Sequence, residues 1–158
     1  MYEVLQVFSA IIFANLNEWL IHKFVLHGLG KRKTNFFHFH WVHHRNCRKA
    51  SNYDVDYEKL LPLSREAWSL LLFFISYIPL FWVVPYFAGT LGVHAIVYYF
   101  THRHTHLNVE WGRRWLPWHH DHHMGKDQDL NWCVLFPLWD YVLGTRKNYF
   151  RKDLDKPS

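Results

Sequence analysis

The chain has 158 residues, which suffices for one domain with a sizeable core and is too short for two. Its formal net charge of +5 suits a membrane surface or an acidic protein partner, and it is too small for a nucleic-acid-binding protein. The only two cysteines, Cys47 and Cys133, exclude a disulfide framework and indicate a reducing compartment. Fourteen histidines and a 20% aromatic share are both unusual and need an explanation.

The first segment predicts a helix from Tyr2 to His27, ended by Gly28 and Gly30. It is mostly apolar but carries five polar or charged residues: Gln6, Asn15, Asn17, Glu18 and Lys23. This leaves open whether the helix spans a membrane at a tilt or only dips into it. A secretory signal peptide is not expected, because the basic n-region is missing.

A basic loop and a short helix over residues 36–45 are expected next. Residues 50–63 predict a loop, in which Pro62 precedes an expected N-cap at Ser64.

Residues 67–100 contain no Asp, Glu, Lys or Arg, and one membrane crossing needs only about 20 apolar residues. This length predicts a hairpin of two short crossings, with its turn from Val84–Pro85 to Gly89. Trp68, Trp82 and Tyr86 lie where interfacial aromatic residues belong. The alternative is a hairpin buried in a soluble helical protein.

The second leg of the hairpin is expected to end at about His106. A short helix follows over residues 111–124, started or kinked by Pro117, and then a tail with a break at Pro137. The basic clusters all lie outside the apolar stretches, which favours a cytoplasmic location for them. The predicted fold class is all-α: an integral membrane protein with a transmembrane hairpin and a cytoplasmic, histidine-rich metal-binding cap. Such a polar cap explains the low mean hydropathy of -0.20.

Ten histidines fall into four groups with regular spacing. The groups are His22 and His27 (HxxxxH), His40, His43 and His44 (HxxHH), His102 and His106 (HxxxH), and His119, His122 and His123 (HxxHH). On a helix, residues three and four apart share a face, so each HxxHH group is expected to point its three imidazoles one way. His22 and His27 diverge by about 140° on an α-helix, which predicts that they serve different metal ions. Ten nitrogen ligands suit two ions, and imidazole binds iron, copper, nickel and zinc.

The other histidines, His38, His104 and His120, are expected to lie off these faces. His94 lies about 12 Å further into the membrane than His102 and is a candidate for substrate contact. Carboxylates are scarce near the groups. Glu18 and Asp140 are expected to accept hydrogen bonds from ligand imidazoles rather than to bind metal themselves.

These residues resemble the fatty acid hydroxylase superfamily, which includes membrane-bound lipid and sterol hydroxylases and desaturases. The histidine boxes "EWLIHKFVLH", "HWVHH", "HRHTH" and "HHDHH" match in order, as does the closing segment "NWCVLFPLWDYVLGT". The resemblance covers about residues 18–145 and implies a single domain over residues 1–158. It also implies a non-haem centre of two iron ions, held by the ten box histidines, that uses O₂ to hydroxylate or desaturate a C–H bond of a membrane lipid. Zinc can replace iron in purified protein.

No haem, iron–sulfur, flavin or nicotinamide motif is present in the sequence, so the electrons are expected from a separate acidic carrier that docks on the basic cap. The single hairpin leaves open a homo-oligomer whose second copy completes the lipid cavity. Three alternatives remain at this point. One is a carotenoid-type hydroxylase, another is a metal carrier, and the third is a non-catalytic membrane subunit with a structural metal site.

Overall fold

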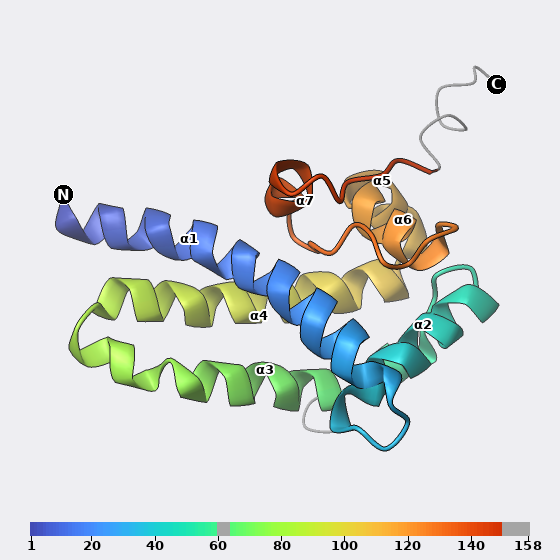
Figure 1. Cartoon of the computed structure of the whole chain (residues 1–158), viewed down its shortest axis with the longest axis horizontal. Helices are drawn as coiled ribbons and strands as arrows, with labels where there is room; N and C mark the ends of the chain where they lie inside the picture. The colour runs from blue at the N-terminus through green and yellow to red at the C-terminus, as the bar shows by residue number, and fades with distance from the viewer. Residues whose placement is uncertain (60–63, 150–158) are drawn as a thin grey trace.

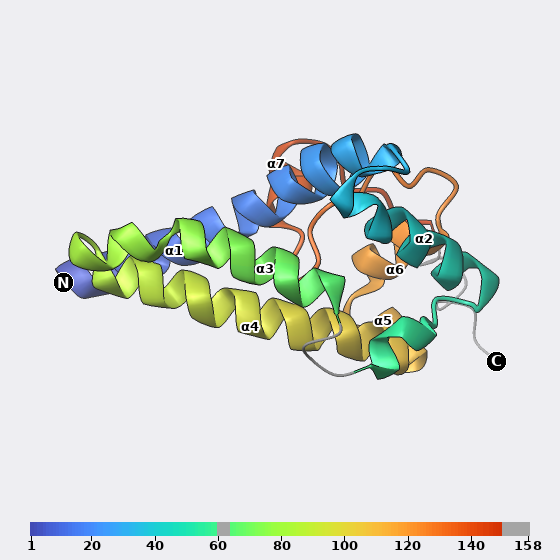
Figure 2. The same cartoon turned by 90° about the horizontal axis from the view of Figure 1, so that it is seen from below.

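The computed structural model describes residues 1–59 and 64–149, and these residues form helices and connecting turns, with no strand among them. The helix α1 (Tyr2–Leu20) continues directly into a π-helix, η1 (Ile21–Gly28), and a short 3-10 turn, η2 (Leu29–Lys31). The helices α3 (Arg65–Ser76) and α4 (Pro85–Leu107) run side by side and are joined by the 3-10 turn η5 (Ile78–Trp82). Figures 1 and 2 show α1 lying against this hairpin, with the N-terminus at the same end as the hairpin turn.

The turn of the hairpin precedes Pro85 instead of following it, so its predicted position was wrong by several residues. Pro85 occupies the first turn of α4, where its missing N–H is not needed, and Gly89 lies inside the helix. The predicted N-cap is confirmed, because the Ser64 hydroxyl accepts a hydrogen bond from the Ala67 N–H. Pro62 lies outside the described residues.

Three polar residues of α1, Gln6, Asn15 and Glu18, are buried against the rest of the protein, which explains how so apolar a helix accommodates them. The Gln6 side-chain oxygen accepts hydrogen bonds from the N–H groups of Tyr86 and Phe87, and so caps the start of α4. Between these helices, Ala10 and Ala14 pack against Leu91 in a small apolar core. The outer face of α1 is therefore left to exposed apolar side chains.

Within the described residues, one helical stretch is long and apolar enough to cross a membrane, and it is Tyr2–Lys31. The sequence favoured the hairpin as the membrane-crossing element, yet α3 has only 12 residues. The three helices nevertheless share one property: their outer faces expose large apolar side chains. These include Val4, Leu5 and Phe8 on α1, Leu72 and Ile75 on α3, and Val93, Ile96 and Phe100 on α4.

Most of the remaining elements gather at the end of the molecule opposite the N-terminus, and the last helix, α7, lies nearer the middle, beside α1 (Figures 1 and 2). We call them the cap: η3 (Phe36–His38), α2 (Phe39–Lys49), η4 (Val55–Glu58), α5 (Val109–Trp115), α6 (Pro117–Met124) and α7 (Leu138–Val142). The helix expected over residues 111–124 is divided at Leu116, and Pro117 starts the second part. The helix expected over residues 36–45 begins as a 3-10 turn and extends to Lys49.

Candidate metal centre

The π-helix η1 brings His22 and His27 together, and the expectation that they serve different ions was wrong. Their ring centroids lie 5.3 Å apart, and both side chains are buried. A π-helix is hydrogen-bonded from residue i to residue i+5, so residues five apart come onto one face. On an α-helix the same two residues would diverge.

Five imidazoles converge at one point of the cap. This first histidine group consists of His22, His27, His40, His44 and His122. His44 Nε2 lies 3.0 Å from His40 Nε2 and 3.1 Å from His122 Nε2. His22 Nε2 lies 2.9 Å from His40 Nε2, and His27 Nε2 lies 3.2 Å from His44 Nε2.

A second histidine group lies beside the first and combines two overlapping sets of possible ligands that share His106 and His123. One set adds His43 and the Cys47 thiol, and the other adds His102 and His119. His106 Nε2 lies 3.2 Å from His102 Nε2 and 3.0 Å from His119 Nε2. The His43 ring packs against His106 and His123, at centroid distances of 4.4 and 4.6 Å. The two groups adjoin, since the rings of His44 and His123 are 4.3 Å apart.

Each HxxHH sequence is divided between the two groups instead of pointing one way as expected. On α2, His40 and His44 belong to the first group and His43 to the second. On α6 the arrangement is reversed, because His119 and His123 belong to the second group and His122 to the first. The two adjacent histidines that end each HxxHH point about 100° apart around the helix axis. Each helix lies between the two groups, so it contributes side chains to both of them.

Most of these imidazoles are fixed at Nδ1 by an acceptor outside the groups. The backbone carbonyls of Trp132, Leu130 and Asn52 accept from His22, His122 and His106, at 2.5, 2.7 and 2.8 Å. The carboxylates of Asp54, Asp129 and Glu66 accept from His43, His27 and His102. An N–H at Nδ1 leaves the lone pair at Nε2, and Nε2 therefore faces the centre of each group as a ligand atom.

The two groups fit metal cations. Where both Nδ1 atoms donate outward, as in His102 and His106, the two Nε2 lone pairs face each other, at 3.2 Å, with no hydrogen between them. His123 has both ring nitrogens buried and no hydrogen-bond partner among the described residues, which costs free energy unless a cation fills the site. Neighbouring nitrogens that each lie about 2.1 Å from one ion, at a right angle, would be about 3.0 Å apart.

Burial also sets the protonation state of the imidazoles. It lowers the pKa of His44, His122 and His123 well below the ordinary value of 6.5, with further lowering from neighbouring imidazoles. These side chains are therefore neutral near pH 7. Neutral imidazole is the form that binds metal.

Comparison with known proteins identifies the family of the chain. Residues 7–145 match the protein family described as Fatty acid hydroxylase. The chain belongs to the fatty acid hydroxylase family. The resemblance predicted from the histidine boxes is thereby confirmed. No curated protein and no solved structure matched the chain significantly. The family and the apolar helix Tyr2–Lys31 together indicate a membrane protein.

In this member of the fatty acid hydroxylase family, Glu18 and Asp140 were expected to accept hydrogen bonds from ligand imidazoles, but both accept from backbone N–H groups instead. Glu18 Oε1 accepts from the N–H groups of Val134 and Leu135, at 2.6 and 2.9 Å. The Asp140 carboxylate accepts from the N–H groups of Trp132 and Cys133, at 2.9 and 2.8 Å. Both carboxylates thus fix the segment whose Trp132 carbonyl orients His22, and the structure gives neither a hydrogen bond to a box histidine.

Sequence reasoning missed the carboxylates that do contact box histidines: Asp54, Glu66 and Asp129. The position of Glu66 in the sequence gave a weak indication of its role, because it lies in the first turn of the helix that begins the charge-free stretch. Asp54 and Asp129 lie in irregular segments, where spacing gives no information on direction.

Several side chains near the centre lie outside it. His104 is exposed and packs on Trp111, and His38 Nδ1 bonds to the Gly30 carbonyl. The Cys47 thiol, by contrast, lies within the second group, 3.4 Å from His106 Nδ1 and 3.8 Å from His43 Nε2. Burial raises the pKa of this thiol, which disfavours the thiolate needed to bind metal.

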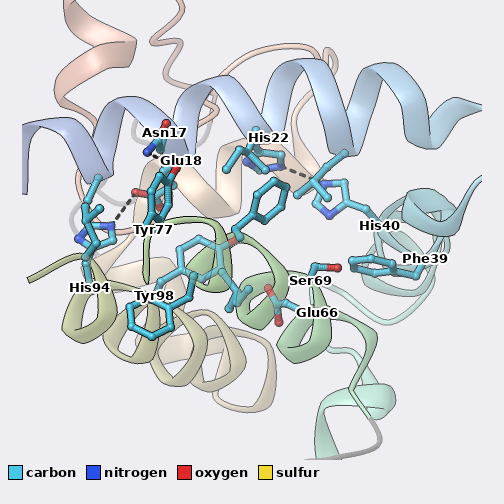
Figure 3. Close-up of a pocket in the computed structure, with 18 residues that line it drawn as sticks. Asn17, Glu18, His22, Phe39, His40, Glu66, Ser69, Tyr77, His94 and Tyr98 are labelled. Atoms are coloured by element: carbon cyan, nitrogen blue, oxygen red, sulfur yellow. Dashed lines mark hydrogen bonds and ion pairs between the residues drawn. The ribbon is translucent and has the colours of Figure 1, made fainter. Parts of the chain in front are cut away.

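An apolar pocket reaches the first histidine group from the side of the hairpin (Figure 3). His22 and His40 form part of its wall, next to Glu66. The rest is mainly apolar and is contributed by α1, η1, α3 and α4. It includes Ala14, Ile21, Leu26, Leu70, Phe73, Phe74, Leu91, Ala95 and Tyr98.

Proposed function

We propose that this protein is an O₂-dependent oxygenase with two iron ions that hydroxylates or desaturates a C–H bond of a membrane lipid. One observation carries the proposal: two adjacent groups of buried imidazole nitrogens lie at the end of an apolar pocket in a fatty acid hydroxylase fold. Iron bound there would supply the activation of O₂ needed to attack an unactivated C–H bond.

The protein itself would supply the metal ligands, orient them, and exclude water from the reacting carbon. The ten histidines would hold the two ions, and the acceptors at Nδ1 would keep each ring turned toward its ion. The apolar wall of the pocket would align a hydrocarbon chain beside His22 and His40 and exclude water from the reacting carbon.

The orientation in the membrane belongs to the same proposal. The exposed apolar faces of α1, α3 and α4 would lie in lipid, with the cap at the cytoplasmic surface. The cap carries exposed basic side chains, among them Arg45, Lys49 and Arg114. An acidic electron-carrier protein would dock there and supply two electrons per turnover.

This docking predicts a dependence on salt. Activity with an acidic protein donor should fall as ionic strength rises, because exposed charges are screened within about 8 Å at physiological salt. Turnover driven by a small neutral reductant is the control and should not respond to salt. If the protein donor also gives salt-independent rates, docking on the basic cap is excluded.

Metal content and lipid analysis test the proposed reaction together. Protein extracted from membranes of iron-supplied cells should contain two irons per chain, and the lipids of those cells should gain one oxygen atom. A loss of two hydrogens would identify a desaturase, and an oxidised carotenoid would identify the carotenoid-type alternative. A tightly held zinc with unchanged lipids, whatever the iron supply, would contradict the proposal and favour a carrier or structural subunit.

A further inference from the structure

The apolar pocket contains a polar cluster one to two helical turns from the metal centre (Figure 3). Glu18 on α1 and His94 on α4 face each other across it, with 3.8 Å between Oε2 and Nε2. Beside them the Asn17 amide donates to the Tyr77 hydroxyl at 2.9 Å. Hydrocarbon chains need no such cluster, and its presence within an apolar wall calls for a polar ligand.

His94 contributes an unused hydrogen-bonding atom. Its Nε2 is buried and has no hydrogen-bond partner in the part of the chain that the structure describes. The 3.8 Å separation from Glu18 is too long for a hydrogen bond. A neutral imidazole can donate through Nε2, so this site offers one free N–H to whatever occupies the pocket.

Glu18 contributes the matching acceptor. Its Oε1 accepts hydrogen bonds from the backbone N–H groups of residues 134 and 135. Among the described residues, Oε2 accepts one hydrogen bond, of 3.0 Å, from the Asn15 amide. A carboxylate oxygen can accept two hydrogen bonds. One acceptor and one donor therefore lie side by side at the wall of the pocket.

We propose that Glu18 and His94 bind a hydroxyl group of the lipid substrate. A hydroxyl is the group that both donates and accepts through one atom, whereas a carbonyl only accepts and a hydrocarbon does neither. This inference rests on the proposed function and narrows its substrate class to lipids that carry a hydroxyl. Glu18 precedes His22 by one turn and His94 precedes His102 by two, which places the hydroxyl about 6 to 12 Å from the ligands along the helices.

Glu18 and His94 would thus be positioning residues. Holding the hydroxyl at a fixed place along the pocket fixes which carbon of the chain lies beside His22 and His40. A lipid without the hydroxyl could still enter the pocket but would not be held in one position.

Lipid binding to the zinc-loaded protein in detergent tests this site without any need for turnover. Native mass spectrometry would compare hexadecanol with hexadecane, which differ only in the hydroxyl. We expect wild-type protein to retain the alcohol about tenfold better than the alkane, as one hydrogen-bonded site in a dry pocket provides. His94→Phe should abolish the preference, and His94→Gln, which keeps an N–H donor, should restore part of it. The matched control is His104→Phe, an exposed position on the same helix, which should keep the preference.

Equal retention of alcohol and alkane by the wild type would overturn the inference, and so would a preference that survives in His94→Phe. If His94→Phe loses its zinc or melts early, His94→Gln and the wild-type ratio decide the question. The proposed oxygenase reaction fails separately: protein that prefers the alcohol but oxidises no lipid when loaded with iron would keep this site and lose the reaction.

Discussion

At the scale of single residues, the acceptors at Nδ1 decide which nitrogen each imidazole turns toward the centre. Asp54 is the clearest case, because it is buried and its Oδ2 lies 2.7 Å from His43 Nδ1. Its other oxygen accepts from the Asn46 amide and the Asp56 N–H, which hold the carboxylate in place. An acceptor fixed in this way orients the ligand before metal binds.

Asp54→Ala should therefore lower the affinity for zinc by about 10- to 100-fold, the usual effect of losing such an acceptor. Competition against a chelator of known affinity measures it. Asp56→Ala is the matched control, since the Asp56 carboxylate is exposed and contacts Asn46 and Lys59 instead of a histidine. Equal affinities in the two variants would show that Asp54 does not orient His43.

His122 belongs to the first histidine group, and its Nε2 lies 3.1 Å from that of His44. His122→Ala should remove metal from that group and abolish activity, because the substitution removes one of the nitrogen ligands and leaves an empty cavity in its place. Metal per chain, counted by elemental analysis, is the readout. His104→Ala should retain the full complement, and unchanged metal in His122→Ala would remove this residue from the ligand set.

At the scale of the elements, close approaches between helices hold the cap against the hairpin. A Cβ on Gly112 of α5 would lie 2.9 Å from the backbone oxygen of Thr105, the neighbour of His106 on α4. A Cβ on Gly89, within α4, would meet nothing within 4 Å. The backbone cannot move aside as a flexible side chain can. Substitution by alanine should therefore have opposite effects on stability at Gly112 and at Gly89.

Gly112→Ala should lower the free energy of unfolding by about 1 to 3 kcal/mol, as overpacking does. Gly89→Ala should instead raise it by up to about 1 kcal/mol, because alanine favours the helix. Thermal or denaturant unfolding of the two variants in one detergent provides the comparison. A Gly112→Ala protein as stable as wild type would show that α5 does not pack closely on α4.

At the scale of the whole molecule, the buried imidazoles link folding to pH. Burial lowers the pKa of His40, His119 and His122 well below 6.5. The unfolded chain takes up protons at about 6.5. Below that pH the unfolded state binds more protons than the folded state. The free energy of unfolding therefore decreases as the pH is lowered.

Metal-free protein should accordingly melt at progressively lower temperatures as the pH is reduced from 7.5 through 6.5 to 5.5. Added zinc should raise the melting temperature most clearly at the upper end of this range, because its ligands are then deprotonated. Calorimetry across the range, with a chelator in the metal-free samples, checks both effects. A melting temperature independent of pH would mean that the histidines are not buried as neutral groups.

Spacing singled out the ten histidines that form the two groups, although residues three and four apart did not all point one way as that spacing predicted. Charge-free length and the signals at Ser64 and Pro117 likewise located most helices, because these signals are local. Local patterns were less reliable at helix ends: the hairpin turn was misplaced, and one helix began as a 3-10 turn.

The sequence by itself therefore determined the residue types, the helices and the family, all of which follow from local spacing and order. Only the tertiary structure decided the rest. The π-helix that joins His22 to His27, the division of each HxxHH between two groups and the carboxylates Asp54, Glu66 and Asp129 all depend on how helices rotate and pack. Rotation about a helix axis is set by contacts between segments distant in the chain, and the spacing of residues along one helix carries no record of it.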